Sequence, residues 1–313
     1  MAISAGIITG LMFIVVQLLQ TDQRESSRSE TQREMQLALD YISNELREAV
    51  YIYTGTQLDC VNVGGICRGA LTDYLPASLT QNSVPVLAFW KQQSFPDSAK
   101  NWCRTNTPRT TAGVACEAGS SYALVVYSLS TANNGNIWQG NARLTRYVLP
   151  EFSSSSALTF NRGYVSPGSS SNFATWPLVS SGAGVTNLQN RADLPSTTNR
   201  RPTGVPDGSP VVLVDFVEDN TPATSAACPA GYNISPSDTR IAAAPGRLSN
   251  ARTFYACVSP RISMGTNQDA IVFLQGSVDG RAGYTTGFAR SAETLPALET
   301  RVLARGVLDR PPQ

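Results

Sequence analysis

The six cysteines are the residues whose type and spacing carry the clearest chemical implication. They fall into successive pairs along the chain: Cys60 with Cys67, Cys103 with Cys116, and Cys228 with Cys257. Six cysteines permit fifteen connectivities, of which local pairing closes the shortest loops. No pair has CxxC spacing and the chain has no histidine, which disfavours a zinc site. We therefore expect disulfides in an oxidising compartment, with six reduced, buried thiols as the alternative.

The absence of histidine also bears on catalysis. It removes Ser-His and Cys-His nucleophile pairs and the usual general base near neutral pH. Chemistry based on carboxylates or on a Ser-Lys pair remains open, but we expect no enzyme, no catalytic residue and no cofactor. The chain has 24 basic and 23 acidic residues, a net charge of +1. No nucleic-acid partner is expected from such a balance.

Acidic residues offer one weak metal candidate. Glu218, Asp219 and Asn220 are adjacent, while Asp207 and Asp279 each precede a glycine. None follows EF-hand spacing, and turn formation accounts for residues of these types in such positions. The interpretation is therefore that the chain has no metal site, and a calcium ion in a loop is the alternative.

The elements that position these residues begin with an apolar N-terminus. Residues 2–20 carry no charge, and the seventeen residues Ile3 to Leu19 are apolar except for Ser4, Thr9 and Gln17. As a helix they would span about 26 Å, close to the thickness of a hydrocarbon core. Without a basic segment before it, this stretch predicts an uncleaved transmembrane or filament-core helix over residues 1–20, rather than a signal peptide or a core helix.

Small residues recur on this helix at a spacing of four. Ala2, Gly6 and Gly10 form a row that would let neighbouring helices approach closely. We interpret these three residues as a candidate helix assembly interface.

The next segment predicts a second, different part of the same helix. Residues 21–34 read TDQRESSRSETQRE, with no apolar side chain and no Pro or Gly, and favour a solvated helical stalk. An apolar stripe then repeats at spacings of four and three. It predicts that the amphipathic part of residues 21–54 packs on the head domain through the following residues: Met35, Leu39, Ile42, Leu46, Ala49 and Tyr53.

After Gly55 the pattern becomes typical of strands separated by turns. Strands are expected at 85–90, 122–130, 143–149, 157–161, 210–218, 254–260 and 270–278, and residues 153–207 read as long surface loops. The predicted fold class is α+β: a long N-terminal helix, transmembrane and then amphipathic, packs on an antiparallel β-sheet head with long loops. The head, residues 55–313, is expected outside the cytoplasm.

This order of elements resembles the type IV pilin and type II secretion pseudopilin superfamily. Residues 35–49, MQLALDYISNELREA, are similar to the segment after the stalk in the larger minor subunits, the J-type pseudopilins and W-type minor pilins. The strings AISAGIITGLMF and RVLARGVLDR resemble the C-type pseudopilins of cyanobacterial hormogonium polysaccharide secretion. The resemblance covers roughly the first 55 residues. Beyond them, the head is similar only in its general strand order, with AIVFLQG near the C-terminus.

The resemblance implies a minor filament subunit that assists polysaccharide secretion or surface motility. Its implied partners are other pilins or pseudopilins, the inner-membrane assembly platform and membrane lipid, with the head periplasmic or extracellular. Family precursors also carry a basic leader and a glutamate early in the helix. Neither is found here, so we expect Met1 to lie inside the family helix and assign leader processing to no residue. The alternatives are a membrane-tethered receptor or adhesin that binds a ligand through its head loops, and an anchored hydrolase.

Overall fold

The structure is a computed structural model of the 313-residue chain. It describes residues 2–106, 114–168, 171–182, 184–190, 203–219, 226–261, 267–284 and 295–304, and for residues 2–9 it describes the helical backbone alone. All statements below concern these residues.

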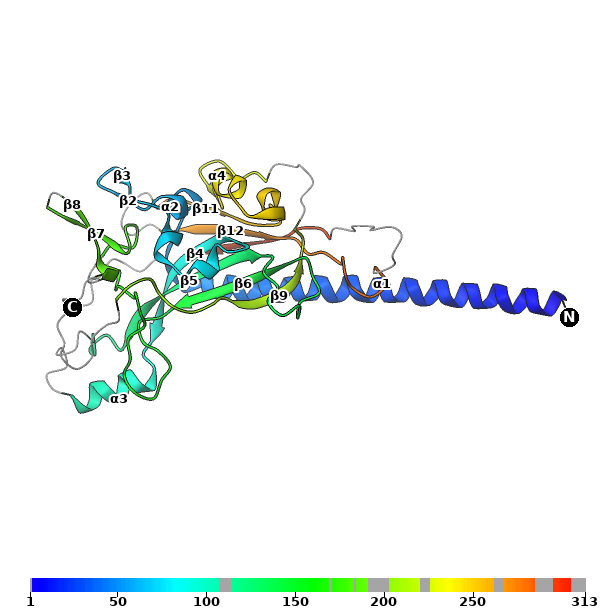
Figure 1. The fold of residues 1–313 in the computed structure, drawn as a ribbon, viewed down its shortest axis with the longest axis horizontal. Coiled ribbons are helices and arrows are strands. Elements are labelled where there is room, and N and C mark those ends of the chain that lie inside the picture. Colours follow the sequence, from blue (N-terminus) through cyan, green and yellow to red (C-terminus); the bar gives the residue numbers. More distant parts are fainter. Residues whose placement is uncertain are drawn as a thin grey trace.

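One long helix and a β-rich head make up the molecule (Figure 1). Helix α1 covers Ala2–Arg47, and its N-terminal part projects well beyond the head while its C-terminal part lies along the sheets. No Pro interrupts the segment, and the run from Thr21 to Glu34 consists of polar residues compatible with a helix. The projecting and the packed parts therefore belong to one continuous element.

The larger sheet has five antiparallel strands in the order β1-β4-β5-β6-β9. The strands are β1 Ala49–Ile52, β4 Ser83–Ser94, β5 Ser120–Ser130, β6 Ala142–Leu149 and β9 Val211–Val217. Their central residues are rich in Val, Leu, Tyr and Phe, which suit a pleated surface with both faces covered.

A second antiparallel sheet has the order β10-β11-β12-β13. Its strands are β10 Asn233–Ser235, β11 Phe254–Val258, β12 Asp269–Leu274 and β13 Leu298–Leu303. Two hairpins complete the described β structure: β2 Asn62–Val63 with β3 Ile66–Cys67, and β7 Leu178–Ser181 with β8 Gly184–Asn187.

The described part of the head also contains three short α-helices. They are α2 Gly55–Asp59, α3 Asp97–Thr105 and α4 Asp238–Ala242. Thr54 and Gln57 form a capping box at the start of α2, and the hydroxyl of Ser237 accepts a hydrogen bond from the N–H of Arg240 in α4. Short 3-10 turns occupy 71–74, 77–79, 188–190 and 246–250.

Two large hydrophobic clusters flank the five-stranded sheet. The first joins the C-terminal part of α1 to the facing sides of both sheets, through residues such as Ile42, Phe89 and Val272. The second lies on the opposite face and is centred on Trp90 and Trp176, under α2 and the β7–β8 hairpin. The five-stranded sheet is thus covered on both faces, with α1 on one of them.

The predicted transmembrane segment needs correction. Among the residues that the structure describes, no stretch of helix is both long enough and apolar enough to cross a bilayer. The fold class with a transmembrane helix is therefore wrong.

The amphipathic part of the helix ends earlier than the stripe suggested. Helix α1 stops at Arg47, and Ala49–Ile52 form strand β1 instead of two further helical turns. The sequence AVYIY, rich in β-branched and aromatic residues, favours a strand over a helix. All four residues of β1 are buried, since the strand lies between the two clusters.

The head also differs in detail from the expected strands. Residues 157–161 form no strand and contribute only an isolated bridge between Phe152 and Phe160. Strand β13 lies in a C-terminal stretch where no strand was expected, and it packs directly against α1. The sequence of β13, LETRVL, carries two charged residues, which hides its pattern.

Candidate functional site

The exposed apolar part of α1 is the most unusual surface of the molecule. Eight large apolar side chains between Leu11 and Leu19 are 48–70% exposed. They surround the helix instead of forming one stripe, because the run is nearly continuous in sequence. A helix that is apolar on every side is normally buried on every side. This segment therefore presents a surface suited to several apolar neighbours at once.

The residues of the candidate helix interface are only partly described. Ala2 and Gly6 belong to α1, but their surroundings lie outside the described residues. Gly10 is exposed, and a Cβ placed on it would meet no atom within 4 Å. Any close approach at Gly10 would therefore involve another molecule and not the head.

A loop of the head binds the polar part of α1 through hydrogen bonds and ion pairs. Ser27 donates a hydrogen bond from its hydroxyl to the carbonyl of Ala282 at 2.9 Å, and Arg24 donates from Nε to the carbonyl of Gly283 at 3.0 Å. Arg281 pairs with Glu30 at 2.8 Å and with Glu34. We call residues 276–284 together with these helix partners the clasp.

The clasp changes the interpretation of residues 21–34. Ser27 and Thr31 are buried, so this part of the helix is not solvated on all sides as the sequence suggested. Arg281 also lies over the ring of Phe216, 4.1 Å from the ring centre, and its side chain is largely buried. Burial raises the pKa of Glu34, although Arg281 acts in the opposite direction. The clasp fixes the direction in which the apolar segment leaves the head.

The six residues predicted to pack the helix on the head lie on two different faces of the five-stranded sheet. Helix residues Met35, Leu39, Ile42 and Leu46 are buried in the first cluster, together with Ala49 of β1. Tyr53 lies instead in the second cluster, where its hydroxyl accepts from the indole N–H of Trp90 at 3.0 Å and donates to the carbonyl of Phe173 at 2.6 Å. Burial raises the pKa of Tyr53 well above its ordinary value.

A buried polar network closes the C-terminal end of α1. Glu45 accepts two hydrogen bonds from Arg146 at 2.8 and 2.7 Å, one from Lys91 at 2.8 Å and one from the hydroxyl of Tyr127 at 2.5 Å. Burial by itself would raise the pKa of Glu45. The hydrogen bonds outweigh that effect and lower the pKa to about 2. The helix is thereby tied to β4, β5 and β6 by one carboxylate.

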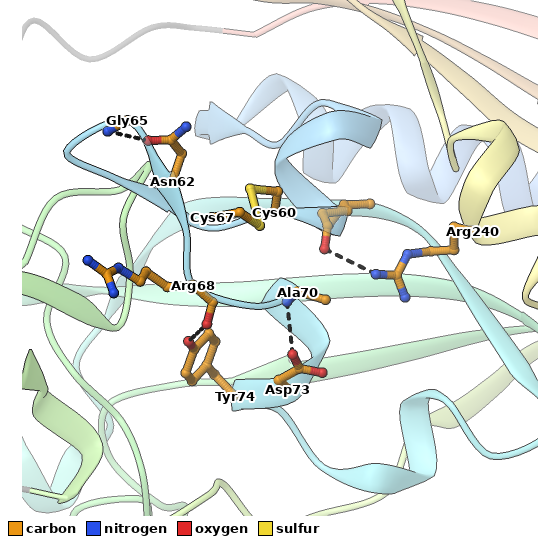
Figure 2. The surroundings of a disulfide bond; sticks show 10 residues. Cys60, Asn62, Gly65, Cys67, Arg68, Ala70, Asp73, Tyr74 and Arg240 are labelled. Atoms are coloured by element: carbon orange, nitrogen blue, oxygen red, sulfur yellow. Dashed lines mark hydrogen bonds between the residues drawn. A yellow bond between two sulfur atoms is a disulfide. The ribbon is translucent and has the colours of Figure 1, made fainter. Parts of the chain in front are cut away.

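Disulfide bonds are present, as predicted, and they join Cys60 to Cys67, Cys103 to Cys116, and Cys228 to Cys257. Figure 2 shows the first of these beside the small β2–β3 hairpin. There the tyrosine hydroxyl of Tyr74 donates to the carbonyl of Arg68, and Arg240 of α4 reaches across to Asp59. The disulfide and these bonds hold a loop-rich end of the head in place.

The acidic candidates are used in structural contacts. Glu218 and Asp219 are buried, and Asp219 pairs with Arg247 at 3.2 Å. Asp207 pairs with Arg162, and Asp279 accepts a hydrogen bond from Asn141 at 3.0 Å, while Asn220 lies outside the described residues. In the part of the chain that is described, no group of three or more possible metal ligands comes together.

The clasp and the Glu45 network were not predicted from the sequence. Their partners are separated by 247 residues for Arg281 and Glu34, and by 101 for Arg146 and Glu45, so no local spacing reveals them. One signal was available: Ser27 and Thr31 are small residues four apart on a stretch otherwise dominated by long polar side chains. Such a pair marks a helix face that a backbone can approach.

Comparison with known proteins found no relative: no family model, no curated protein and no solved structure matches the chain. The function must therefore be argued from the residues and their arrangement.

Proposed function

We propose that the chain is a minor pilin-like subunit that joins a type IV pilus-like or type II secretion-like filament through the apolar segment of α1. The observation that carries this proposal is the run of exposed apolar side chains from Leu11 to Leu19 on a helix that projects from a folded head. Water contact with such a surface is unfavourable, and apolar helices of neighbouring subunits would remove it.

The clasp supports the same proposal. A filament subunit must transmit the position of its helix to its head, and a loosely attached helix could not do so. Arg24, Ser27, Glu30 and Glu34 all contact residues 281–283, at the point where the helix leaves the head. The apolar segment therefore extends from a fixed base, which reduces the entropy lost on association.

The role of the filament follows from the resemblance of residues 35–49 and of the strings at both chain ends. On that basis the filament would serve polysaccharide secretion or surface motility, with the assembly platform and the other filament subunits as partners. The subunit itself performs no covalent chemistry in this proposal.

Site-specific crosslinking in the producing cell tests the proposal. A photoreactive amino acid replaces Ile14 on the helix, and in a control it replaces Ile137, an exposed apolar residue of the head. We expect the probe at position 14 to crosslink to the N-terminal apolar helix of another filament subunit or of a second copy, identified by mass spectrometry of the joined peptides. The probe at position 137 should give no such product.

Gly10→Leu sharpens the test. A Cβ at this position meets no described atom within 4 Å, so the fold is expected to persist, but the leucine side chain would block close helix approach. We expect a several-fold lower crosslink yield from position 14. If the position 14 probe crosslinks to lipid only, or if Gly10→Leu leaves the yield unchanged, the proposed helix interface is wrong.

A further inference from the structure

A cleft of about 760 Å³ opens on the head, beyond the C-terminal end of α1. Strands β4, β5 and β6 continue past the point where the helix stops, so part of the sheet face that carries Phe89 and Val125 is left without helical cover. Gln93 pairs with Ser121 across β4 and β5, and Val148 of β6 forms the floor beside them. Both ends of the long loop region 153–207 contribute to the walls, and the size is in the range of ligand pockets.

The charges in this cleft are already matched. Its charged lining residues are Arg146, Arg162 and Asp207. Arg146 is engaged by Glu45, and Arg162 pairs with Asp207 at 3.4 Å while donating to the carbonyl of Thr203 at 2.9 Å. A strongly charged ligand would have to displace one of these partners. The electrostatics therefore favour a ligand without net charge.

Three uncharged polar side chains in the lining are available for a ligand, whereas others, such as Asn161 and Thr159, already make hydrogen bonds within the protein. Gln93, Ser94 and Ser121 line the cleft, and their side chains make no hydrogen bond to any residue that the structure describes. Each hydroxyl can donate and accept, and the amide can do both through separate atoms. A ligand with many hydroxyl groups, each a donor and an acceptor, matches this set.

Apolar surface lies among these polar groups. Val148 and Pro150 of the floor are half-buried, and Val211 at the rim is 71% exposed. The C–H faces of a pyranose ring could pack on such small apolar side chains while its hydroxyls reach the serines and the glutamine. An extended peptide fits less well, because Pro150 and Pro210 lack the N–H groups that would pair with an added strand.

We propose that this cleft binds a neutral hexopyranose glycan. The proposal is independent of filament assembly, because the cleft lies at the end of α1 opposite to the exposed apolar segment.

Binding measurements on the full chain test it. The protein is kept in a detergent without a sugar headgroup, and cellohexaose, maltohexaose, laminarihexaose and mannohexaose are compared by saturation-transfer NMR and calorimetry. Hexagalacturonate and an uncharged extended hexapeptide serve as the anionic and the peptide probes. We expect at least one neutral hexaose to bind, and to bind more tightly than either of these two probes.

Two variants and one control locate the site. Gln93→Ala combined with Ser121→Ala should weaken binding about tenfold, as expected for the loss of two hydrogen bonds. Val211→Trp at the exposed rim should abolish binding by filling the cleft, without disturbing the core. Gln81→Ala combined with Ser180→Ala removes exposed groups outside the lining and should leave binding unchanged.

Three results would overturn the proposal: no binding of any neutral hexaose, tighter binding of the galacturonate or the peptide, or wild-type affinity in both cleft variants. A failed crosslink at position 14 would leave this proposal untouched, so the two ideas fail separately.

Discussion

At the scale of single residues, Glu45 is the clearest case of a side chain that organises its surroundings. It lies near the end of α1 and is almost completely buried, yet it remains charged because Arg146, Lys91 and Tyr127 all donate to it. Removal of one partner from such a group leaves buried charge uncompensated. The side chain of Glu48, nearby, is largely exposed and pairs with Lys91 at 3.3 Å, so it provides an internal comparison.

We expect Glu45→Gln to lower the free energy of unfolding by about 3 kcal/mol at pH 7, since its hydrogen bonds lower the pKa of Glu45 from 4.5 to about 2. A depressed folded pKa gives stability that is complete above the unfolded pKa and is lost as the pH falls toward about 2. The difference between wild type and variant should therefore shrink between pH 4.5 and pH 2, as measured by urea unfolding.

Glu48→Gln is the matched control and should cost less than about 1 kcal/mol, as is usual for exposed ion pairs. A wild-type-to-variant difference for Glu45→Gln that stays constant from pH 7 to pH 2 would contradict the assignment of the depressed pKa to Glu45.

At the scale of elements, α1 and the core strands can be predicted from local sequence patterns, whereas the contacts that join α1 to the head cannot. The stripe from Met35 to Leu46 has helical spacing and is buried, and the apolar runs around Phe89 and Val125 are strands. The end of the helix at Arg47 was missed, because the apolar spacing through Ala49 and Tyr53 fits a helix while the residue types favour a strand. The cleft was not foreseen, since its walls combine β4, β6 and loop residues that meet only in the fold.

The clasp packs closely against side chains of α1, and Gly276 makes that close packing possible because it has no side chain of its own. A Cβ at this position would lie 2.9 Å from Cγ of Met35 and 3.0 Å from Cγ2 of Thr31. We expect Gly276→Val to reduce the free energy of unfolding by about 1–3 kcal/mol and to speed amide hydrogen exchange in residues 24–35.

Gly184→Val is the control for this substitution, because a Cβ on Gly184 meets no atom within 4 Å. Should Gly276→Val leave both the stability and the exchange of α1 as in the wild type, the clasp does not hold the helix as described.

At the scale of the whole molecule, two surfaces lie at opposite ends of one helix. The apolar segment extends away from the head (Figure 1). The cleft opens where the helix ends against the sheet. Between them, the clasp and the Glu45 network fasten α1 to the head near both ends of its packed part. The head and the packed helix thus form one body, and the projecting segment is an appendage whose loss the body should tolerate.

This division predicts the effect of removing residues 1–20. Because the described side chains of the segment are mostly exposed, we expect the shortened chain to keep its free energy of unfolding within about 0.5 kcal/mol and to retain glycan binding in the cleft. It should no longer co-purify with the filament subunits identified by crosslinking at position 14.

The combined substitution of Leu11, Ile14 and Leu18 by Ser is the matched comparison. These residues lie on one stripe of the helix and are each at least 58% exposed, so their replacement preserves chain length while it removes apolar surface. If this variant fails to assemble, as expected for the shortened chain, the segment contributes to assembly through its apolar contacts. If the shortened chain still assembles, the filament contacts must lie on the head, and the apolar segment would need another explanation.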